Sequence, residues 1–170
     1  MKTLLPFVLA FFSFFLLQAQ EEDTPRLTKG SFMIETGYNV VGGISSGSGF
    51  NLISGEGTTI LSFGGDFGYF VADNFALKFR LSLLGLFDDF DDESLTIISV
   101  GGKYYLAGQV PLEASIGVIS GFGATELLGN ILVGYAIPLA KNINLEPSVG
   151  LILSDGDSLF NAKIPFVLFF

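Results

Sequence analysis

The ionisable side chains that could do chemistry in this chain are carboxylates, amines, guanidinium groups and five tyrosine phenols, because its 170 residues include no histidine and no cysteine. Without histidine, the usual general base and every Ser-His or Cys-His pair are missing. Without cysteine, thiol catalysis, zinc-thiolate sites and disulfides are excluded. The stretch Gly43-Ile44-Ser45-Ser46-Gly47 matches G-x-S-x-G, but that motif requires a strand-turn-helix context and a histidine partner. The sequence therefore predicts no catalytic residue and no cofactor.

A run of acids at residues 88–93 is the most concentrated charge feature of the chain. The candidate metal ligands in this run, which could hold Ca²⁺ or Mg²⁺ through oxygen atoms, are Asp88, Asp89, Asp91, Asp92 and Glu93. The spacing and the glycine of an EF-hand loop are missing, so a solvated loop is the preferred interpretation. Divalent cations that bridge this loop to lipopolysaccharide phosphates are the alternative.

Eight further charges stand alone among apolar and small residues. They are Glu35, Asp66, Lys78, Arg80, Lys103, Glu113, Glu146 and Lys163. Four acids and four bases are what a closed interior requires, because buried charges must pair. Paired carboxylates can also serve as the acid and base of a glycosidase, but nothing in the sequence separates the environment of one carboxylate from that of another.

The elements that must position these charges are strands with a period of two. Between residues 75 and 83, for example, Phe75, Leu77 and Phe79 alternate with Lys78 and Arg80. The same alternation predicts about eight strands, each at or slightly above the length needed to cross a membrane. Their expected ranges are 31–40, 58–71, 75–83, 94–106, 110–120, 127–139, 143–154 and 158–170. A slip in phase predicts a bulge at residues 97–98.

The two faces of these strands distinguish two kinds of barrel. In a soluble lipocalin-like barrel the apolar face points inward, whereas in a membrane barrel it meets lipid and the interior is polar. Here the polar face consists mainly of Gly, Ser, Ala and Asn with the eight isolated charges, which suits a crowded interior better than a solvated surface. The sequence therefore predicts an all-β, eight-stranded antiparallel up-and-down transmembrane β-barrel whose interior is plugged by paired charges.

The connections support this assignment. Short turns are expected at 72–74, 107–109 and 140–142, and longer, more polar or acidic loops at 41–57, 88–93, 122–126 and 155–157. Periplasmic turns and longer outer loops are the pattern of bacterial outer-membrane barrels, which also carry aromatic girdles at both interfaces. The aromatic residues expected near strand ends are Phe32, Tyr69, Phe70, Phe75, Phe87, Tyr104, Tyr105, Phe160 and Phe169. The long first loop, at 41–57, is the predicted most variable outside contact.

The composition and the N-terminus indicate an exported chain. Of its residues 49% are hydrophobic and 15% charged, and the net charge is −9. Since nucleic-acid binding depends on Lys and Arg that neutralise phosphates, no nucleic-acid partner is expected. Residues 1–20 combine Lys2 with an apolar run of roughly 14 residues, too short for a membrane-spanning helix, which predicts a signal peptide. Residues 21–30 then form a short N-terminal periplasmic segment and residues 31–170 the barrel.

One segment carries a family resemblance. Residues 68–77, Gly-Tyr-Phe-Val-Ala-Asp-Asn-Phe-Ala-Leu, are similar to the GYFVADNLAL strand-turn-strand signature of the outer-membrane β-barrel domain of Bacteroidetes-type proteins. Residues 29–32, residues 102–106 and the terminal Phe170 resemble the same family. The resemblance implies an eight-stranded barrel of the OmpA-transmembrane and OmpX type. It also implies that the C-terminal aromatic residue, Phe170, is the signal read by the barrel-assembly machinery.

These observations favour one function and leave others open. The preferred hypothesis is a monomeric, non-enzymatic barrel of the bacterial outer membrane with a structural or surface-interaction role, surrounded by outer-membrane lipids and lipopolysaccharide. The alternatives are a narrow passive, porin-like channel and a soluble lipocalin-like ligand-binding barrel. An outer-membrane enzyme that acts on lipid is a further alternative, but such barrels are expected to rely on histidine.

Overall fold

The computed structural model describes residues 27–41, 44–55, 58–87, 92–121, 123–154 and 157–170. In these ranges the chain forms 11 strands. They are β1 (Phe32–Val41), β2 (Ile44–Gly55), β3 (Thr58–Ala72), β4 (Phe75–Phe87), β5 (Asp92–Leu106), β6 (Val110–Gly121), β7 (Ala124–Gly134), β8 (Ile137–Ala140), β9 (Ile143–Leu145), β10 (Ser148–Ser154) and β11 (Asp157–Phe169). Over the same ranges we find no helix that has both the length and the apolar character needed to cross a membrane. The predicted signal peptide, residues 1–20, lies outside the described residues.

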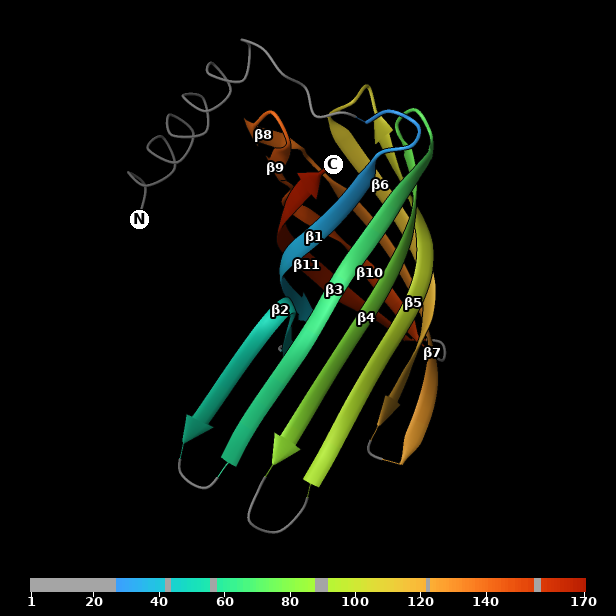
Figure 1. Cartoon of the computed structure of the whole chain (residues 1–170). Helices are drawn as coiled ribbons and strands as arrows, with labels where there is room; N and C mark the ends of the chain where they lie inside the picture. The colour runs from blue at the N-terminus through green and yellow to red at the C-terminus, as the bar shows by residue number, and fades with distance from the viewer. Residues whose placement is uncertain (1–26, 42–43, 56–57, 88–91, 122, 155–156) are drawn as a thin grey trace, which may run out of the picture.

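Eight of the strands close into a ring of antiparallel neighbours. The order around the ring is β1, β3, β4, β5, β6, β7, β10 and β11, and β11 pairs back with β1. Figure 1 shows the strands running up and down between an end that carries both termini of the folded part, the terminus end, and an opposite end, the loop end. The predicted eight-stranded antiparallel up-and-down barrel is confirmed.

The register around the ring sets the tilt of the strands. Ser31 lies opposite Phe70, whose backbone N–H donates to the Ser31 carbonyl at 2.9 Å. From Phe70 the paired residues are Ala76, Lys103, Glu113, Leu132, Gly150, Asn161 and, back on β1, Val41. The ring thus closes with a stagger of ten residues, from Ser31 to Val41. In a ring of eight strands this stagger corresponds to a tilt of roughly 40° and an interior that side chains can just fill.

The expectation of a loop over 41–57 is wrong for residues 44–55, which form β2. The first part of β2, 44–48, pairs with β1, and the second part, 49–55, pairs with β3. Because β1 and β3 pair directly only from Phe32↔Tyr69 to Glu35↔Asp66, β2 supplies the backbone partners of both strands farther toward the loop end. Gly and Ser, which dominate this stretch, have low strand propensity, so the sequence pattern does not reveal the strand.

Two predicted strands are interrupted near the terminus end. The expected strand 127–139 divides into β7 and β8, and 143–154 divides into β9 and β10. The ladder continues across the interruption, since the Tyr135 N–H donates to the Pro147 carbonyl at 3.0 Å and the Glu146 N–H to the Pro165 carbonyl at 2.9 Å. Pro147 and Pro165 have no N–H to contribute, which explains the break in the ladder. Each pair of short strands therefore occupies one strand position of the ring.

The three short turns are found where they are predicted, all at the terminus end (Figure 1). Between β3 and β4, Asn74 has a φ of 62°, a left-handed conformation that asparagine tolerates. Between β5 and β6, Ala107 and Gly108 have φ values of 52° and 73°. The predicted bulge at residues 97–98 is wrong, because β5 keeps a continuous register with β4 and β6 there. The irregularity lies instead beside the first turn, between Phe70 and Ala72.

Candidate functional site

The outer and inner faces of the barrel have opposite chemistry. Along the wall, Phe63 and Val133 point outward and are 54% and 47% exposed, whereas Glu113 is 5% exposed. Outward positions on all eight ring strands carry exposed Leu, Ile, Val, Phe or Tyr side chains. The apolar face therefore looks away from the barrel axis and the charged face is enclosed, which is the reverse of a lipocalin-like barrel.

The structure brings all eight isolated charges to inward positions, where they form one group that we call the charge cluster. It consists of Glu35, Asp66, Lys78, Arg80, Lys103, Glu113, Glu146 and Lys163, of which all but Arg80 are less than 10% exposed. They come from six ring strands, β1, β3, β4, β5, β6 and β11, and from the interruption between β9 and β10 that holds Glu146. Because inward positions alternate along each strand, the ring geometry alone directs these side chains to a common centre.

Glu35 is the centre of the charge cluster. Its carboxylate accepts hydrogen bonds from Lys78 Nζ at 2.9 Å, from Lys163 Nζ at 3.0 Å and from Lys103 Nζ. Glu113 Oε2 accepts from Lys78 and Lys163, both at 2.8 Å. Lys78 and Lys163 are thus each held by both carboxylates and Lys103 by Glu35, so that these buried ammonium groups are paired with acids.

Two further groups complete the cluster at its edges. On one side Asp66 accepts a bidentate pair from Arg80, with Arg80 Nε at 2.7 Å from Oδ1. On the other side Glu146 accepts from Lys103, from the Tyr105 hydroxyl at 3.0 Å and from Asn144 Nδ2 at 3.1 Å. With four acids and four bases, the cluster carries no formal charge.

A layer of apolar side chains fills the barrel on the terminus side of the charge cluster. This apolar plug consists of Leu27, Met33, Phe70, Ala76, Tyr105, Ala136, Val167 and Phe169. Three members were expected in an exposed aromatic girdle, but Phe70, Tyr105 and Phe169 are 0%, 0% and 3% exposed. Their phase along the strands explains the error, since Phe70 shares its parity with Asp66, and Tyr105 with Lys103. The other aromatic residues expected at strand ends are exposed or half-buried: Phe32, Tyr69, Phe75, Phe87, Tyr104 and Phe160.

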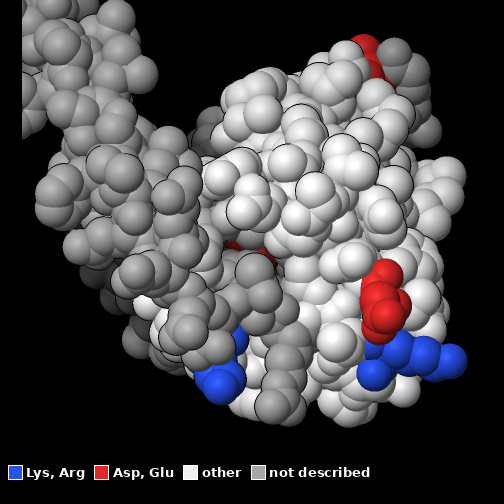
Figure 2. Space-filling view, turned by 90° about the horizontal axis from the view of Figure 1, so that it is seen from above, with Lys and Arg blue, Asp and Glu red and all other residues white. Residues whose placement is uncertain are grey.

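The segment before β1 lies against the apolar plug. The Asn74 N–H donates to the Leu27 carbonyl at 2.7 Å, and the Gly30 N–H donates to the Phe70 carbonyl at 2.8 Å. The Lys29 N–H donates to Asp73 Oδ1 at 2.9 Å. Figure 2 looks onto this end of the molecule, where the described surface is mostly uncharged and charged side chains appear only at separate places. The charge cluster is thus separated from this end by the plug and the 27–31 segment.

The interior becomes more open on the loop side of the charge cluster. On β6 the inward side chains Pro111 and Glu113 are buried, whereas Ser115 and Ile119 are partly exposed. The same change occurs on β10, where Ser148 is buried and Ile152 is partly exposed. We call this region the loop-side interior. Its inward apolar side chains are Leu84, Leu95, Ile97, Ile119, Leu128 and Ile152. The barrel is therefore filled at one end and accessible from the other.

The candidate metal ligands are not assembled into a site that can be described. Asp88, Asp89 and Asp91 lie outside the described residues, and of Asp92 and Glu93 only the backbone, at the start of β5, is described. Among the described residues there is no group of three or more metal-ligating side chains. The assignment of divalent cations to this segment stays a prediction.

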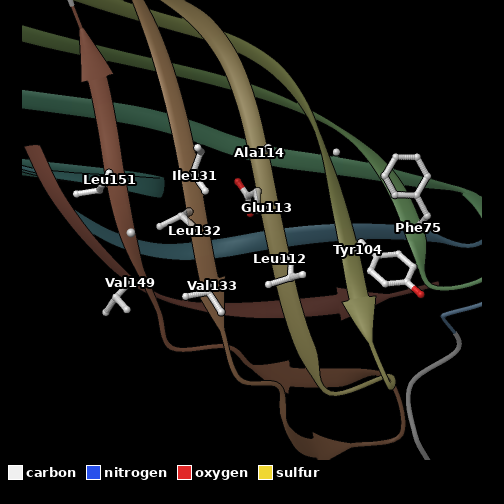
Figure 3. A pocket seen from close by; sticks show the side chains of 12 residues that line it. Phe75, Tyr104, Leu112, Glu113, Ala114, Ile131, Leu132, Val133, Val149 and Leu151 are labelled. Atoms are coloured by element: carbon white, nitrogen blue, oxygen red, sulfur yellow. The ribbon is translucent and has the colours of Figure 1, made fainter. Parts of the chain in front are cut away.

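A groove on the outer wall is lined mainly by apolar side chains. It crosses β5, β6, β7 and β10, where small residues at Gly102, Ala114 and Gly150 lie among larger ones. Figure 3 shows Val149, Val133, Leu112 and Tyr104 in a row along it. Because its lining is almost wholly apolar and faces outward, the groove belongs to the outer wall rather than to an active site.

The terminal Phe170 lies on the outer face and is 63% exposed. Its backbone N–H donates to the Phe32 carbonyl at 3.0 Å and its carbonyl accepts from the Phe32 N–H at 3.1 Å. These two bonds join the last residue of the chain to the first residue of β1 and close the ring at the terminus end.

Comparisons with known proteins identify the fold. No family model and no curated protein matches the sequence. OprG of Pseudomonas aeruginosa is 15% identical with a TM-score of 0.55, and the match covers 88% of this chain and 99% of that protein. Ail of Yersinia pestis is 13% identical with a TM-score of 0.53, covering 84% and 100%. A de novo designed transmembrane β-barrel is 10% identical with a TM-score of 0.50, covering 84% and 98%. The chain thus has the fold of outer-membrane β-barrel proteins over most of its length.

Proposed function

We propose that this chain is an integral, monomeric protein of the bacterial outer membrane, without enzymatic activity, that has a structural or surface-interaction role. The observation that carries the proposal is the pairing of an apolar outer wall with an enclosed, electrically neutral charge cluster. A wall of exposed Phe63, Val133 and similar side chains is stable against hydrocarbon and unfavourable against water. The same arrangement argues against a soluble lipocalin-like barrel.

The proposal also covers the export of the protein, its assembly into the membrane and the molecules that surround it. Residues 1–20 direct export as a signal peptide and residues 21–30 form a short periplasmic segment. Phe170 is the signal for the barrel-assembly machinery, which its exposed position supports. Outer-membrane lipids and lipopolysaccharide are the molecules that cover the apolar wall. The narrower resemblance to the OmpA-transmembrane and OmpX type of barrel is part of the same proposal.

The barrel does not act as an open channel in this proposal. Two successive layers block the interior: the charge cluster, whose Glu35 and Lys103 are each 1% exposed, and the apolar plug, whose Phe70 and Tyr105 are fully buried. An eight-stranded barrel is only wide enough for side chains to fill. The porin-like alternative therefore requires both layers to move aside.

Fractionation and electrophoresis test the location. The full chain, expressed in a bacterium with an outer membrane, is expected in the outer-membrane fraction. It should also migrate differently on gels before and after boiling, because the hydrogen-bonded ring of a membrane barrel resists detergent until it is heated. Recovery in the soluble periplasmic fraction would contradict the membrane location and favour the lipocalin-like alternative.

Planar bilayers test the sealed interior. The purified barrel should show no reproducible single-channel steps. Steps that change when Lys78 is replaced by glutamine, but not when the outward Phe63 is replaced by leucine, would establish the channel alternative. Leakage that is equal in all three proteins would instead reflect disturbed lipid.

A further inference from the structure

We infer that the loop-side interior is a binding site for small, uncharged, amphipathic molecules that carry an amide or hydroxyl group. The inference rests on the proposed function, because the loop end must face the aqueous exterior for such molecules to enter. It goes beyond that function by naming a site and a class of ligand. The proposed site consists of an accessible space, a wall with apolar side chains, a polar floor with unpartnered amide atoms beneath it, and charges at both ends.

The space follows from the exposure of the inward side chains. On β4, Ala76 and Lys78 are buried, but Arg80, Ser82 and Leu84 farther along the same face are partly exposed. The same order, buried then partly exposed, is present on β5, β6, β7 and β10. Since these side chains point toward the barrel axis, their exposed area lies inside the barrel. The interior is therefore a dead-end space whose bottom is the charge cluster.

The wall of this space combines apolar side chains with hydroxyl groups. Ile97, Ile119 and Ile152 reach into it from three different strands, and Ser82 and Ser115 lie among them. Apolar pockets with a few polar groups are the usual form of small-molecule sites. An alkyl group of a ligand would remove both its own surface and that of the isoleucines from water.

Two amide atoms just beneath the floor are buried and have no hydrogen-bond partner among the described residues. Asn161 Nδ2 donates to Asn130 Oδ1 at 3.1 Å across the side chain-free Gly150, which leaves Asn130 Nδ2 and Asn161 Oδ1 unpartnered. Both asparagines are more than nine-tenths buried. Asn161 lies one inward position from Lys163 on the loop side of the cluster. The partly exposed Leu128 and Ile152 lie next to this pair, so a ligand reaches the two amide atoms by displacing these two side chains.

One free donor and one free acceptor match a group that both accepts and donates, such as a primary amide or a hydroxyl. Each end of the space repels ions of one sign. The Arg80 guanidinium, 17% exposed on the floor, repels a cation. The exposed Glu126 and Asp157 at the loop end repel an anion, and the acids of the floor are already paired. A neutral head group is therefore the class that the charges admit.

The experiment uses hexanamide as the probe, with hexanoate and hexylammonium as charged probes of the same chain length. The purified barrel in lipid nanodiscs carries labelled isoleucine δ1-methyl groups, which NMR observes individually. Ile97, Ile119 and Ile152 report on the loop-side interior. The outward Ile98, Ile116 and Ile131 report on partitioning into lipid, because they are 41–57% exposed on the outer wall. Boiling-dependent migration on gels first establishes that the barrel has formed.

The expected result is a saturable shift of the three inward methyl groups with hexanamide, with binding at least tenfold weaker for the two charged probes. Equal, unsaturable shifts of inward and outward methyl groups would mean partitioning into lipid only and would overturn the inference. Tighter binding of hexanoate than of hexanamide would overturn the assigned class. If the purified chain forms no barrel, the proposed function is wrong, and the inference that rests on it is wrong as well.

Matched variants locate the site. Ile119→Phe fills the interior from β6 and should abolish the shifts at Ile97 and Ile152, whereas Ile116→Phe, on the outer face of the same strand, should leave them unchanged. Asn130→Leu removes the free donor and should weaken binding about fivefold, the effect of one hydrogen bond. Binding that survives both Ile119→Phe and Asn130→Leu in barrels that still form would overturn the placement of the ligand.

Discussion

Replacing Glu35 by glutamine is the most direct test of the charge cluster. Glutamine keeps the shape of the side chain but removes one negative charge from the point where Lys78, Lys103 and Lys163 converge. The cluster then holds four bases and three acids, all but one of them less than 10% exposed. The amide NH₂ also turns a donor toward ammonium groups that are themselves donors, so at least one bond becomes repulsive.

The expected cost can be bounded from these contacts. Removing one partner of a buried ion pair costs about 3–5 kcal/mol, because a charge is left without compensation. Lys78 and Lys163 retain Glu113, and Lys103 retains Glu146, so no lysine loses every acidic partner. We therefore expect the lower part of this range, about 3 kcal/mol, for the free energy of unfolding.

Urea titration of the barrel in lipid vesicles, followed by the fraction that migrates as the folded form on unboiled gels, measures this free energy. The matched control is Glu126→Gln, an exposed acid near the loop end, which should change stability by less than about 0.5 kcal/mol. The double variant Glu35→Gln with Lys163→Met restores the balance of charges and should recover a substantial part of the loss. A cost below about 1 kcal/mol for Glu35→Gln would refute the argument that these charges depend on one another.

Three other predictions concern the plug, a strand contact and the C-terminus. Phe70→Ala should lower the free energy of unfolding by about 3–5 kcal/mol by leaving a cavity in the apolar plug, whereas Phe63→Ala on the outer face of the same strand should cost much less, because lipid fills the space. Gly150→Ala places a methyl group against the backbone of the neighbouring strand and should destabilise the barrel by about 1–3 kcal/mol in the same titration, whereas Gly129→Ala meets only ordinary contacts at 3.6 Å and should be neutral. Phe170→Ala should reduce the amount of protein in the outer membrane of cells while leaving refolding of the purified chain into detergent unchanged; equal amounts in cells would exclude Phe170 as the assembly signal.

The alternation of side chains predicts most of the fold. Because the period of a strand is two, Lys78 and Arg80 must face the opposite side from Leu77 and Phe79, and the balance of acids and bases indicates which side is enclosed. The ring of strands then brings Glu35 and the other charges together without further information. The sequence thus predicts which residues form the charge cluster, although it does not predict which of them are hydrogen-bonded to one another.

The features that the pattern misses have other physical origins. Ile44–Gly55 forms β2 because the backbones of β1 and β3 need partners, and not because of its side chains. The burial of Phe70 and Tyr105 in the plug follows from their phase, which outweighs the tendency of aromatic residues to lie at membrane interfaces. The unpartnered atoms of Asn130 and Asn161 depend on side-chain geometry across Gly150, which periodicity cannot supply.

Because the strands differ in length, they end at different heights at the loop end of the barrel. β3 and β5 each have 15 residues and, at the tilt set by the stagger, rise about 38 Å, whereas the apolar band of such a membrane is only about 25 Å tall. Figure 1 shows strands β2 to β5 extending farther at the loop end than β10 and β11. β3 and β5 therefore exceed the height of such a band by about 13 Å. In the proposed location, with the loop end facing the exterior, a molecule that approaches along the membrane surface would meet high strands at β3 and β5 and low strands at β10 and β11.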